Sequence, residues 1–124
     1  MSQPLVSVIC LCYNQARWVE DSIKSVLNQT YNNIQLIVVD DKSTDNSATV
    51  IRNLLADKPQ IKFISNSKNL GNCKAFNRAL KEAKGQYIID LAADDVLLPN
   101  RITEGVNTFQ KKDTIKDLVY LATI

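Results

Sequence analysis

Apolar and polar positions form alternating blocks along the chain, and the blocks predict five strands separated by four helices. Residues 5–12, 34–39, 61–65, 87–91 and 118–121 are short apolar runs, typical of strands buried in a parallel sheet. The stretches between them carry apolar residues at helical spacing, which is typical of helices packed on a sheet. The expected core-facing helix residues are Trp18 or Val19 with Ile23, Val26 and Leu27; Ala48, Ile51, Leu54 and Leu55; Phe76, Ala79, Leu80 and Ala83; and Ile102, Val106 and Phe109.

Glycine, proline and short polar residues mark the expected ends of the helices. Gly85 is expected to cap the third helix, and Pro99 suits the first turn of the fourth. Gly71 is free to adopt positive φ in the polar loop before the third helix. Asp45 is expected to cap the second helix, and Asp40 to support the loop that leads into it.

The alternation of strands and helices predicts an α/β fold, a three-layer α/β/α domain over residues 1–124 with a mainly parallel sheet. Polar clusters at residues 13–14, 40–41, 66–71 and 94–95 each follow a predicted strand. The carboxyl ends of parallel strands share one edge of the sheet, where such folds bind their ligands. The four clusters are therefore expected to converge on one site.

The adjacent carboxylates of Asp94 and Asp95 are the sharpest chemical signal in the chain. Two acids at the end of a buried strand repel each other, and a bound hard cation would relieve that repulsion. The alternative is a solvated turn that precedes a helix. The chain has no histidine, so a metal here would be held by oxygen, which favours Mg²⁺ or Mn²⁺.

Composition narrows the classes of function. The 124 residues are 45% hydrophobic and 23% charged with a net charge of +2, which fits one globular domain and does not indicate a nucleic-acid partner. No signal peptide or membrane-spanning stretch is evident, so a cytoplasmic location is expected, with membrane association of a longer parent protein left open. Cys10, Cys12 and Cys73 are expected to be small buried hydrophobes and form no disulfide framework.

The residues after the first strand exclude two nucleotide-binding classes. Tyr13-Asn14-Gln15-Ala16-Arg17 contains no glycine, so neither a Rossmann dinucleotide turn nor a P-loop is present there. Metal-dependent nucleotide chemistry and a phosphoacceptor receiver-like switch remain. The second needs an aspartate on a middle strand, whereas the third strand ends in Ser65-Asn66. A third candidate is a non-catalytic interaction fragment that dimerises through an exposed apolar edge.

Several separate motifs closely resemble those of family 2 glycosyltransferases of the GT-A fold, from about residue 5 to about residue 102. The matching stretches are Val6-Ser7-Val8-Ile9 with Tyr13-Asn14, residues 22–31, residues 37–45, Asn69-Leu70-Gly71, residues 75–79, residues 85–88 and Asp94-Asp95. The resemblance implies the nucleotide-binding part of an enzyme of polysaccharide biosynthesis. Such an enzyme transfers a sugar with inversion from a nucleotide-diphosphate-sugar donor, here expected to be a UDP-sugar, to a carbohydrate or lipid-linked acceptor.

The resemblance also implies roles for individual residues. Asp41 would accept an N–H from the donor's base, Asp94 would face the ribose or share the metal, and Asp95 would coordinate Mn²⁺ or Mg²⁺ against the diphosphate. Leu11 and Tyr13, at the end of the first strand, would line the base pocket, and Asn14 is a further donor-binding residue. Asn69, Gly71 and Lys74, before and within the start of the third helix, would lie near the ribose or phosphates. Structural alternatives are a tyrosine packed under a loop, a turn at Asn69 and Gly71, and a solvated Lys74.

The sequence departs from the family pattern in three places. Leu11-Cys12 replaces the usual Pro-Thr. Ala92 stands where the acidic motif often begins with an aspartate, which leaves Asp94 and Asp95 to carry the metal site. The family's catalytic base and acceptor-binding half lie downstream, so no catalytic residue is expected here and the apolar end at Ile124 suggests a truncated protein with little or no transferase activity.

Overall fold

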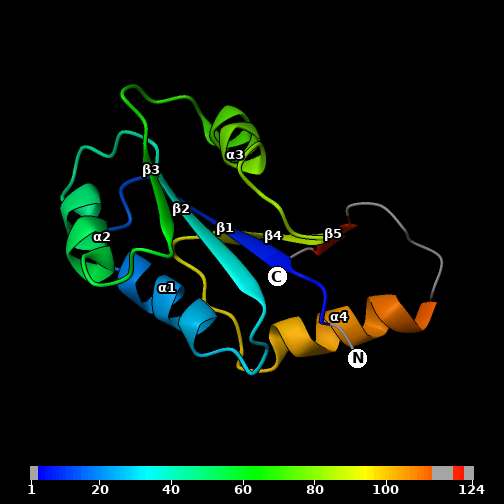
Figure 1. The fold of residues 1–124 in the computed structure, drawn as a ribbon. Coiled ribbons are helices and arrows are strands. Elements are labelled where there is room, and N and C mark those ends of the chain that lie inside the picture. Colours follow the sequence, from blue (N-terminus) through cyan, green and yellow to red (C-terminus); the bar gives the residue numbers. More distant parts are fainter. Residues whose placement is uncertain (1–2, 113–118, 122–124) are drawn as a thin grey trace.

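A computed structural model describes residues 3–112 and 119–121, and it shows one five-stranded parallel sheet with helices on both faces (Figure 1). The expected three-layer α/β/α architecture is therefore confirmed. The strands are β1 (Val6–Cys12), β2 (Ile34–Asp40), β3 (Lys62–Ser65), β4 (Tyr87–Ala92) and β5 (Val119–Leu121). The helices are α1 (Val19–Leu27), α2 (Ser47–Leu55), α3 (Asn72–Leu80) and α4 (Arg101–Lys112).

The strand order β3-β2-β1-β4-β5 places β1 at the centre of the sheet. The chain first builds outward through β2 and β3, and then returns by α3 to place β4 on the other side of β1. This is the doubly wound order 3-2-1-4-5, whereas receiver-like domains have the order 2-1-3-4-5. The structure thus contradicts the receiver-like alternative, and it creates a switch point between the carboxyl ends of β1 and β4.

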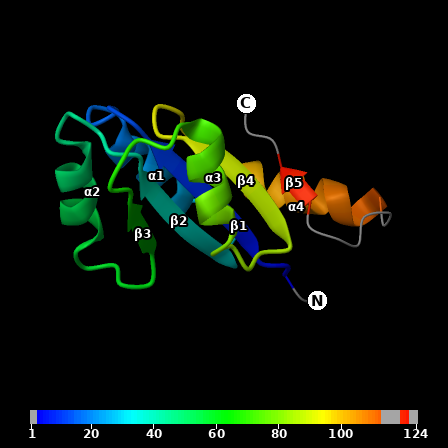
Figure 2. The ribbon, with the colours of Figure 1, turned by 90° about the horizontal axis from the view of Figure 1, so that it is seen from above.

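Successive side chains of a strand point to opposite faces of the sheet, and each face has its own hydrophobic core. Val6, Val8 and Cys10 of β1 point to one face and join the buried residues of α1, α2 and α4, whereas Ile9 points to the other face, which α3 covers (Figures 1 and 2). Cys12 lies in the first core with Cys10, as expected of small buried hydrophobes. The same expectation for Cys73 is wrong, because this thiol is exposed on α3.

Of the two candidates for the start of the buried stripe of α1, the structure buries Val19 and not Trp18, whereas the expected core residue Leu27 lies at the surface. Val19, Ile23 and Val26 are buried, but Trp18 is 46% exposed and Leu27 is 41% exposed. Trp18 precedes the first helical residue, and the Arg17 guanidinium lies 4.9 Å from its ring centroid. The helix therefore buries a narrower stripe than its sequence pattern predicted.

The expected cap at Gly85 is wrong, because α3 ends at Leu80. Gly85 is needed for close approach instead: an added Cβ would lie 2.6 Å from both the backbone N and Oγ of Ser7. Pro99 also lies outside the helix that it was expected to begin, since α4 starts at Arg101. The carbonyl of Pro99 accepts a hydrogen bond from Thr30 N at 2.9 Å, which ties the turn before α4 to the end of α1.

Across the described residues, none of the helices combines the length and apolar character that a membrane crossing would require.

Candidate functional site: a cleft at the switch point

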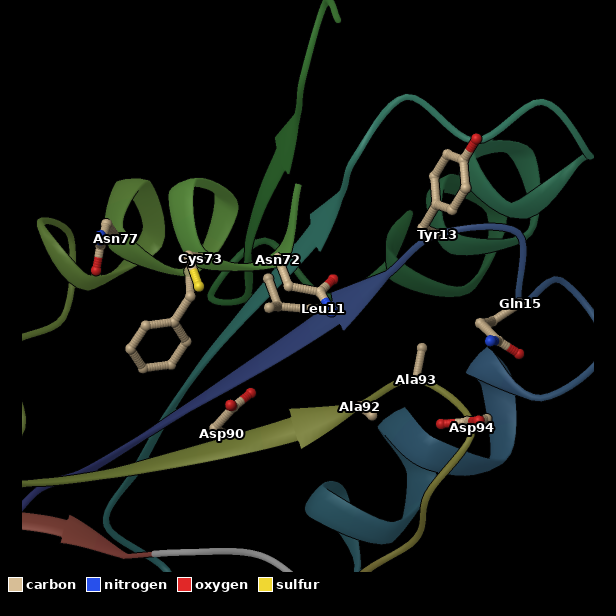
Figure 3. A pocket seen from close by; sticks show the side chains of 11 residues that line it. Leu11, Tyr13, Gln15, Asn72, Cys73, Asn77, Asp90, Ala92, Ala93 and Asp94 are labelled. Carbon is tan, nitrogen blue, oxygen red and sulfur yellow. The ribbon is translucent and has the colours of Figure 1, made fainter. Parts of the chain in front are cut away.

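A cleft of about 700 Å³ opens at the switch point, between the carboxyl ends of β1 and β4 and the flank of α3. In Figure 3, Asn72, Cys73 and Asn77 stand on the α3 side, opposite Asp90 and Asp94. The lining residues come from the end of β1, from α3, and from β4 with the turn after it: Leu11, Tyr13 and Gln15; Asn72, Cys73, Phe76 and Asn77; and Asp90, Ala92, Ala93 and Asp94. The expected convergence of strand-end residues is thus confirmed for β1 and β4.

The acidic pair occupies the turn directly after β4. Asp94 lines the cleft, whereas Asp95 lies outside the lining set, and both residues are exposed. Two backbone hydrogen bonds fix the turn, from Asp95 N to the carbonyl of Ala92 and from Ala93 N to the carbonyl of Leu11, both at 2.9 Å. The second bond joins the turn to β1, so the acidic pair is held at the switch point.

The donor chemistry of this turn fits a hard divalent cation that shares its coordination with a ligand. Among the described residues, no group of three or more acidic, cysteine or histidine side chains could hold a metal. Two carboxylates are nevertheless a usual protein contribution to a Mg²⁺ site, where substrate phosphates and water complete the coordination. Asp94 and Asp95 therefore suit a metal that binds together with a diphosphate.

A row of buried or half-buried polar side chains on α1 holds the acidic turn in place. Ser22 Oγ donates to the carbonyl of Ala92 at 3.3 Å, and Ser25 Oγ accepts from Leu97 N at 3.0 Å. The two serines lie three positions apart, so they share one helix face. These hydrogen bonds attach the chain to α1 on both sides of Asp94 and Asp95. Sequence reasoning missed them, although the serines interrupt the apolar stripe of α1 at helical spacing.

Asp41 does not line the cleft and is nearly buried, with 5% of its surface exposed. Its Oδ1 accepts hydrogen bonds from Asn66 Nδ2 and Leu70 N, and its Oδ2 accepts one from Gly71 N, all at 2.9 Å. Asn69 Nδ2 donates to the backbone carbonyl of Asp41 at 3.0 Å. Asp41 thus organises the loop that leads into α3, and Asn69 and Gly71 build that loop as the structural alternative supposed.

Asn14 joins two loops at the same edge. It adopts φ of 55°, and its Oδ1 accepts hydrogen bonds from Thr44 N at 2.7 Å and Asp45 N at 3.2 Å. Asn14 N in turn donates to Ser43 Oγ at 2.9 Å. Asn14 therefore fixes the path of the β1–α1 loop beside Tyr13, and its contact with a nucleotide stays a prediction.

The expected role of Asp40 in the loop is confirmed, whereas the N-cap residue of α2 is Asn46 and not Asp45 as expected. Asp40 accepts hydrogen bonds from Ser43 N at 3.1 Å and Ser43 Oγ at 2.6 Å, which closes the loop after β2. Asp45 Oδ1 accepts from Ser47 N at 2.9 Å, at the first residue of α2. Desolvation raises the pKa of Asp45, but hydrogen bonds from Ser47 and Ala16 outweigh it and hold that pKa below its usual value.

Of the other predicted site residues, Leu11 and Tyr13 line the cleft, whereas Lys74 does not. Leu11 is half-buried in the cleft, and Tyr13 is 43% exposed there, so the tyrosine is not packed under a loop. Lys74 is exposed on α3 and outside the lining set, which leaves its proposed contact untested. The lining residues that sequence reasoning missed are Gln15, Asn72, Cys73, Phe76, Asn77, Asp90, Ala92 and Ala93. Helical spacing on α3 and the two-residue period of β4 were the available signals.

The parallel doubly wound sheet, with an acidic turn at its switch point, has the fold of GT-A glycosyltransferases. The chain belongs to glycosyl transferase family 2, whose sequence model matches residues 7–121. The resemblance seen in the motifs is thereby confirmed.

Relatives by sequence agree with this membership. The chain is 38% identical over 112 residues to an uncharacterized glycosyltransferase of Haemophilus influenzae, covering 90% of this chain and 35% of that protein. It is 32% identical over 109 residues to glycosyltransferase GlyG of Streptococcus pneumoniae serotype 4, covering 88% and 36%. The chain thus spans about a third of the length of these relatives.

Solved structures share the fold. A mannosyltransferase from Pyrobaculum calidifontis in complex with GDP-Man and Mn²⁺ matches with a TM-score of 0.75 and 26% identity, over 85% of this chain and 32% of that one. TarS of S. aureus (residues 1–349), in complex with UDP-GlcNAc, matches with a TM-score of 0.77 over 86% and 31%; at 24% identity this likeness concerns the fold alone.

Proposed function

We propose that residues 1–124 form one nucleotide-sugar-binding domain, which supplies the donor- and metal-binding part of an inverting glycosyltransferase. The observation that carries the proposal is the cleft at the switch point, which Leu11 and Tyr13 at the β1 end and Asp94 of the β4 turn all line. Ligands of doubly wound sheets bind in such crevices. The cleft volume of about 700 Å³ lies within the usual range for small-molecule sites.

In this proposal, the nucleotide lies with its base toward the carboxyl ends of β1 and β2, and with its diphosphate toward β4 and the start of α3. Tyr13 offers an exposed aromatic ring for the base, and Asp41 with Asn69 and Gly71 forms the wall beneath it. Asn14 supports this wall from the neighbouring loop, and Lys74 contributes a positive charge near the phosphates. The similar proteins with bound UDP-GlcNAc and GDP-Man support a nucleotide-sugar donor, and we expect uridine as the nucleoside.

Asp94 and Asp95 would hold Mn²⁺ or Mg²⁺ against the diphosphate, and Asp94 would also reach the ribose. The bound ion would supply neutralisation of the negative charge on the departing diphosphate. The chain's own part is to hold two carboxylates in a turn tied to β1 and α1, so that they need little rearrangement when the donor binds. The complex of the mannosyltransferase with Mn²⁺ supports the choice of a divalent ion.

Inversion requires a carboxylate that takes the proton of the acceptor hydroxyl as it attacks the anomeric carbon. We assign no residue of this chain to that role, and we propose that the base and the contacts to a carbohydrate or lipid-linked acceptor belong to a part of the parent enzyme beyond these residues. The 124-residue chain is accordingly expected to bind donor with little or no transferase activity.

Titration calorimetry with UDP in the presence of Mn²⁺ tests the proposal. We expect binding by the intact chain, a loss of at least about tenfold in affinity for Asp95→Asn, and a similar loss for Asp94→Asn, because each removes a charged ligand of the metal. Asp21→Asn is the matched control, since Asp21 is an exposed acid on α1. Absence of UDP binding, or equal effects of the three substitutions, would refute the proposal.

Dimerisation is a separate prediction. Within the described residues β5 pairs only with β4, and it forms one edge of the sheet. Size-exclusion chromatography with light scattering across a range of concentrations measures association. A monomer at every concentration would remove the case for an edge-mediated dimer.

A further inference from the structure

The carboxylate of Asp41 has a definite number of acceptor positions left for a ligand. A carboxylate offers about four lone-pair positions, two on each oxygen. Asn66 Nδ2 and Leu70 N take both positions on Oδ1, and Gly71 N takes one position on Oδ2. Among these contacts one lone pair of Oδ2 remains unused. Asp41 can therefore accept one more hydrogen bond, on a defined oxygen.

Arg78 determines which way the amide of Asn66 faces. The guanidinium NH1 of Arg78 donates to Asn66 Oδ1 at 2.6 Å. Arginine has donors only, so this bond requires the oxygen of the amide to face α3 and the nitrogen to face Asp41. Asn66 is 3% exposed, and its backbone N also bonds to the carbonyl of Asp40 at 2.9 Å. The chain Arg78–Asn66–Asp41 is thus a directed series of hydrogen bonds from α3 to the end of β2.

This series of hydrogen bonds ends at Asp41, which contacts residues next in sequence to the cleft lining. Asp41 N donates to the carbonyl of Cys12, the residue before Tyr13, and Asp41 Oδ2 accepts from Gly71, the residue before Asn72. Tyr13 and Asn72 both line the cleft, one from each side. Asp41 therefore lies between the two stretches that would enclose a nucleobase.

We propose that Asn66 and Arg78 are positioning residues that leave Asp41 one acceptor position, and that this makes the chain prefer a uracil nucleotide to a guanine nucleotide. The inference rests on the proposed function, because it supposes that the donor's base reaches Asp41. The hydrogen bonds that Asp41 already accepts within the protein would thus decide which base it can bind. Asn66 and Arg78 would take part in this choice although neither lines the cleft.

The two bases present different numbers of donors to such a carboxylate. The uracil edge has one imino N–H between two carbonyls, which matches a single free lone pair. Guanine presents an imino N–H and an adjacent amino group, and it pairs best with both oxygens of a carboxylate at once. With Oδ1 occupied, the amino group of guanine would be left without its acceptor. A buried donor without a partner weakens binding by about tenfold or more.

The decisive measurement compares the affinities of UDP and GDP, each with Mn²⁺, for the intact chain and three variants. The wild-type chain should bind UDP at least about tenfold more tightly than GDP. Asn66→Ala frees a lone pair of Oδ1, and Arg78→Gln loosens the amide that occupies it, so both should bring the ratio of the two affinities toward unity. Arg78→Lys keeps a donor and should restore much of the ratio.

Arg52→Gln is the matched control, because Arg52 is an exposed arginine that contacts Ser65 and the ring of Phe63 on the α2 side. It should leave the ratio unchanged. Thermal melts accompany each variant; if Asn66→Ala fails to fold, the exposed Arg78 decides the question through Arg78→Gln and Arg78→Lys.

The outcomes separate this inference from the proposed function. Failure of the wild-type chain to bind UDP refutes the proposed function itself. Equal affinity for UDP and GDP refutes only the selectivity. A uniform fall in both affinities for Arg78→Gln, with their ratio unchanged, would mean that the hydrogen bonds from Arg78 through Asn66 to Asp41 support the fold and do not select the base.

Discussion

Gln29 Oε1 accepts a hydrogen bond from Ile102 N at 3.0 Å, which joins the segment just after α1 to the first turn of α4. The same amide donates from Nε2 to the carbonyl of Leu98 at 2.7 Å, and Gln29 is 8% exposed. One side chain thus satisfies backbone groups on both sides of the turn that precedes α4. Since Asp94 and Asp95 lie just before this segment, Gln29 also limits how far the acidic turn can move.

Gln29→Ala should therefore destabilise the chain by about 1–3 kcal/mol, because it strips buried backbone groups of their partners. Urea denaturation measures the free energy of unfolding, and Gln60→Ala, at an exposed position, is the control. We also expect weaker binding of Mn²⁺ with UDP. A stability equal to that of the control would show that water replaces the amide at no cost.

Gly85→Ala should destabilise the fold although the change adds one methyl group. The new Cβ would lie 2.6 Å from Ser7 N and 2.9 Å from the carbonyl oxygen of Leu5, which are backbone atoms that cannot rotate away. The start of β4 must shift from β1, at a cost of about 1–3 kcal/mol. Thermal denaturation beside Lys84→Ala, an exposed neighbour, checks this expectation. Equal melting temperatures would contradict it.

Cys73 should be the reactive thiol of the folded chain, because it is exposed and lines the cleft, whereas Cys10 and Cys12 are buried. Mass spectrometry after brief alkylation should find label on Cys73 alone, with the other two modified only in denaturant. UDP with Mn²⁺ should slow the labelling of Cys73 if the nucleotide occupies the cleft. Unchanged labelling in saturating nucleotide would place the nucleotide elsewhere.

The stability of the chain should fall as the pH rises above about 9. Burial raises the pKa of the Cys10 thiol from 9.0 to about 12, and burial also raises the pKa of Cys12. The unfolded chain then loses these protons at a lower pH than the folded chain, so rising pH favours unfolding from about 9 up to the folded pKa. Urea denaturation at pH 8 and pH 10 measures the fall. Cys10→Ala should reduce this pH dependence, and an identical slope would exclude a contribution from Cys10.

Local sequence patterns determined most of the elements, because burial on two faces produces unbroken apolar runs and burial on one helix face produces a regular stripe. The strand from Val6 to Cys12 and the inward residues Ile23, Ile51 and Ile102 follow directly from those patterns. The same patterns misplaced Leu27 and Gly85, since exposure at a helix end and close approach between strands depend on neighbours distant in the chain.

The acidic turn and the loop residues of the site were identifiable from sequence, because Asp41, Asp94 and Asp95 follow strands whose ends must share one edge. The sequence could not tell which of them face the cleft. Only the tertiary structure decided that Asp94 lines it, that three N–H groups already surround the Asp41 carboxylate, and that Arg78 orients Asn66. Those contacts join residues far apart in the chain, and packing α3 against the sheet brings them together.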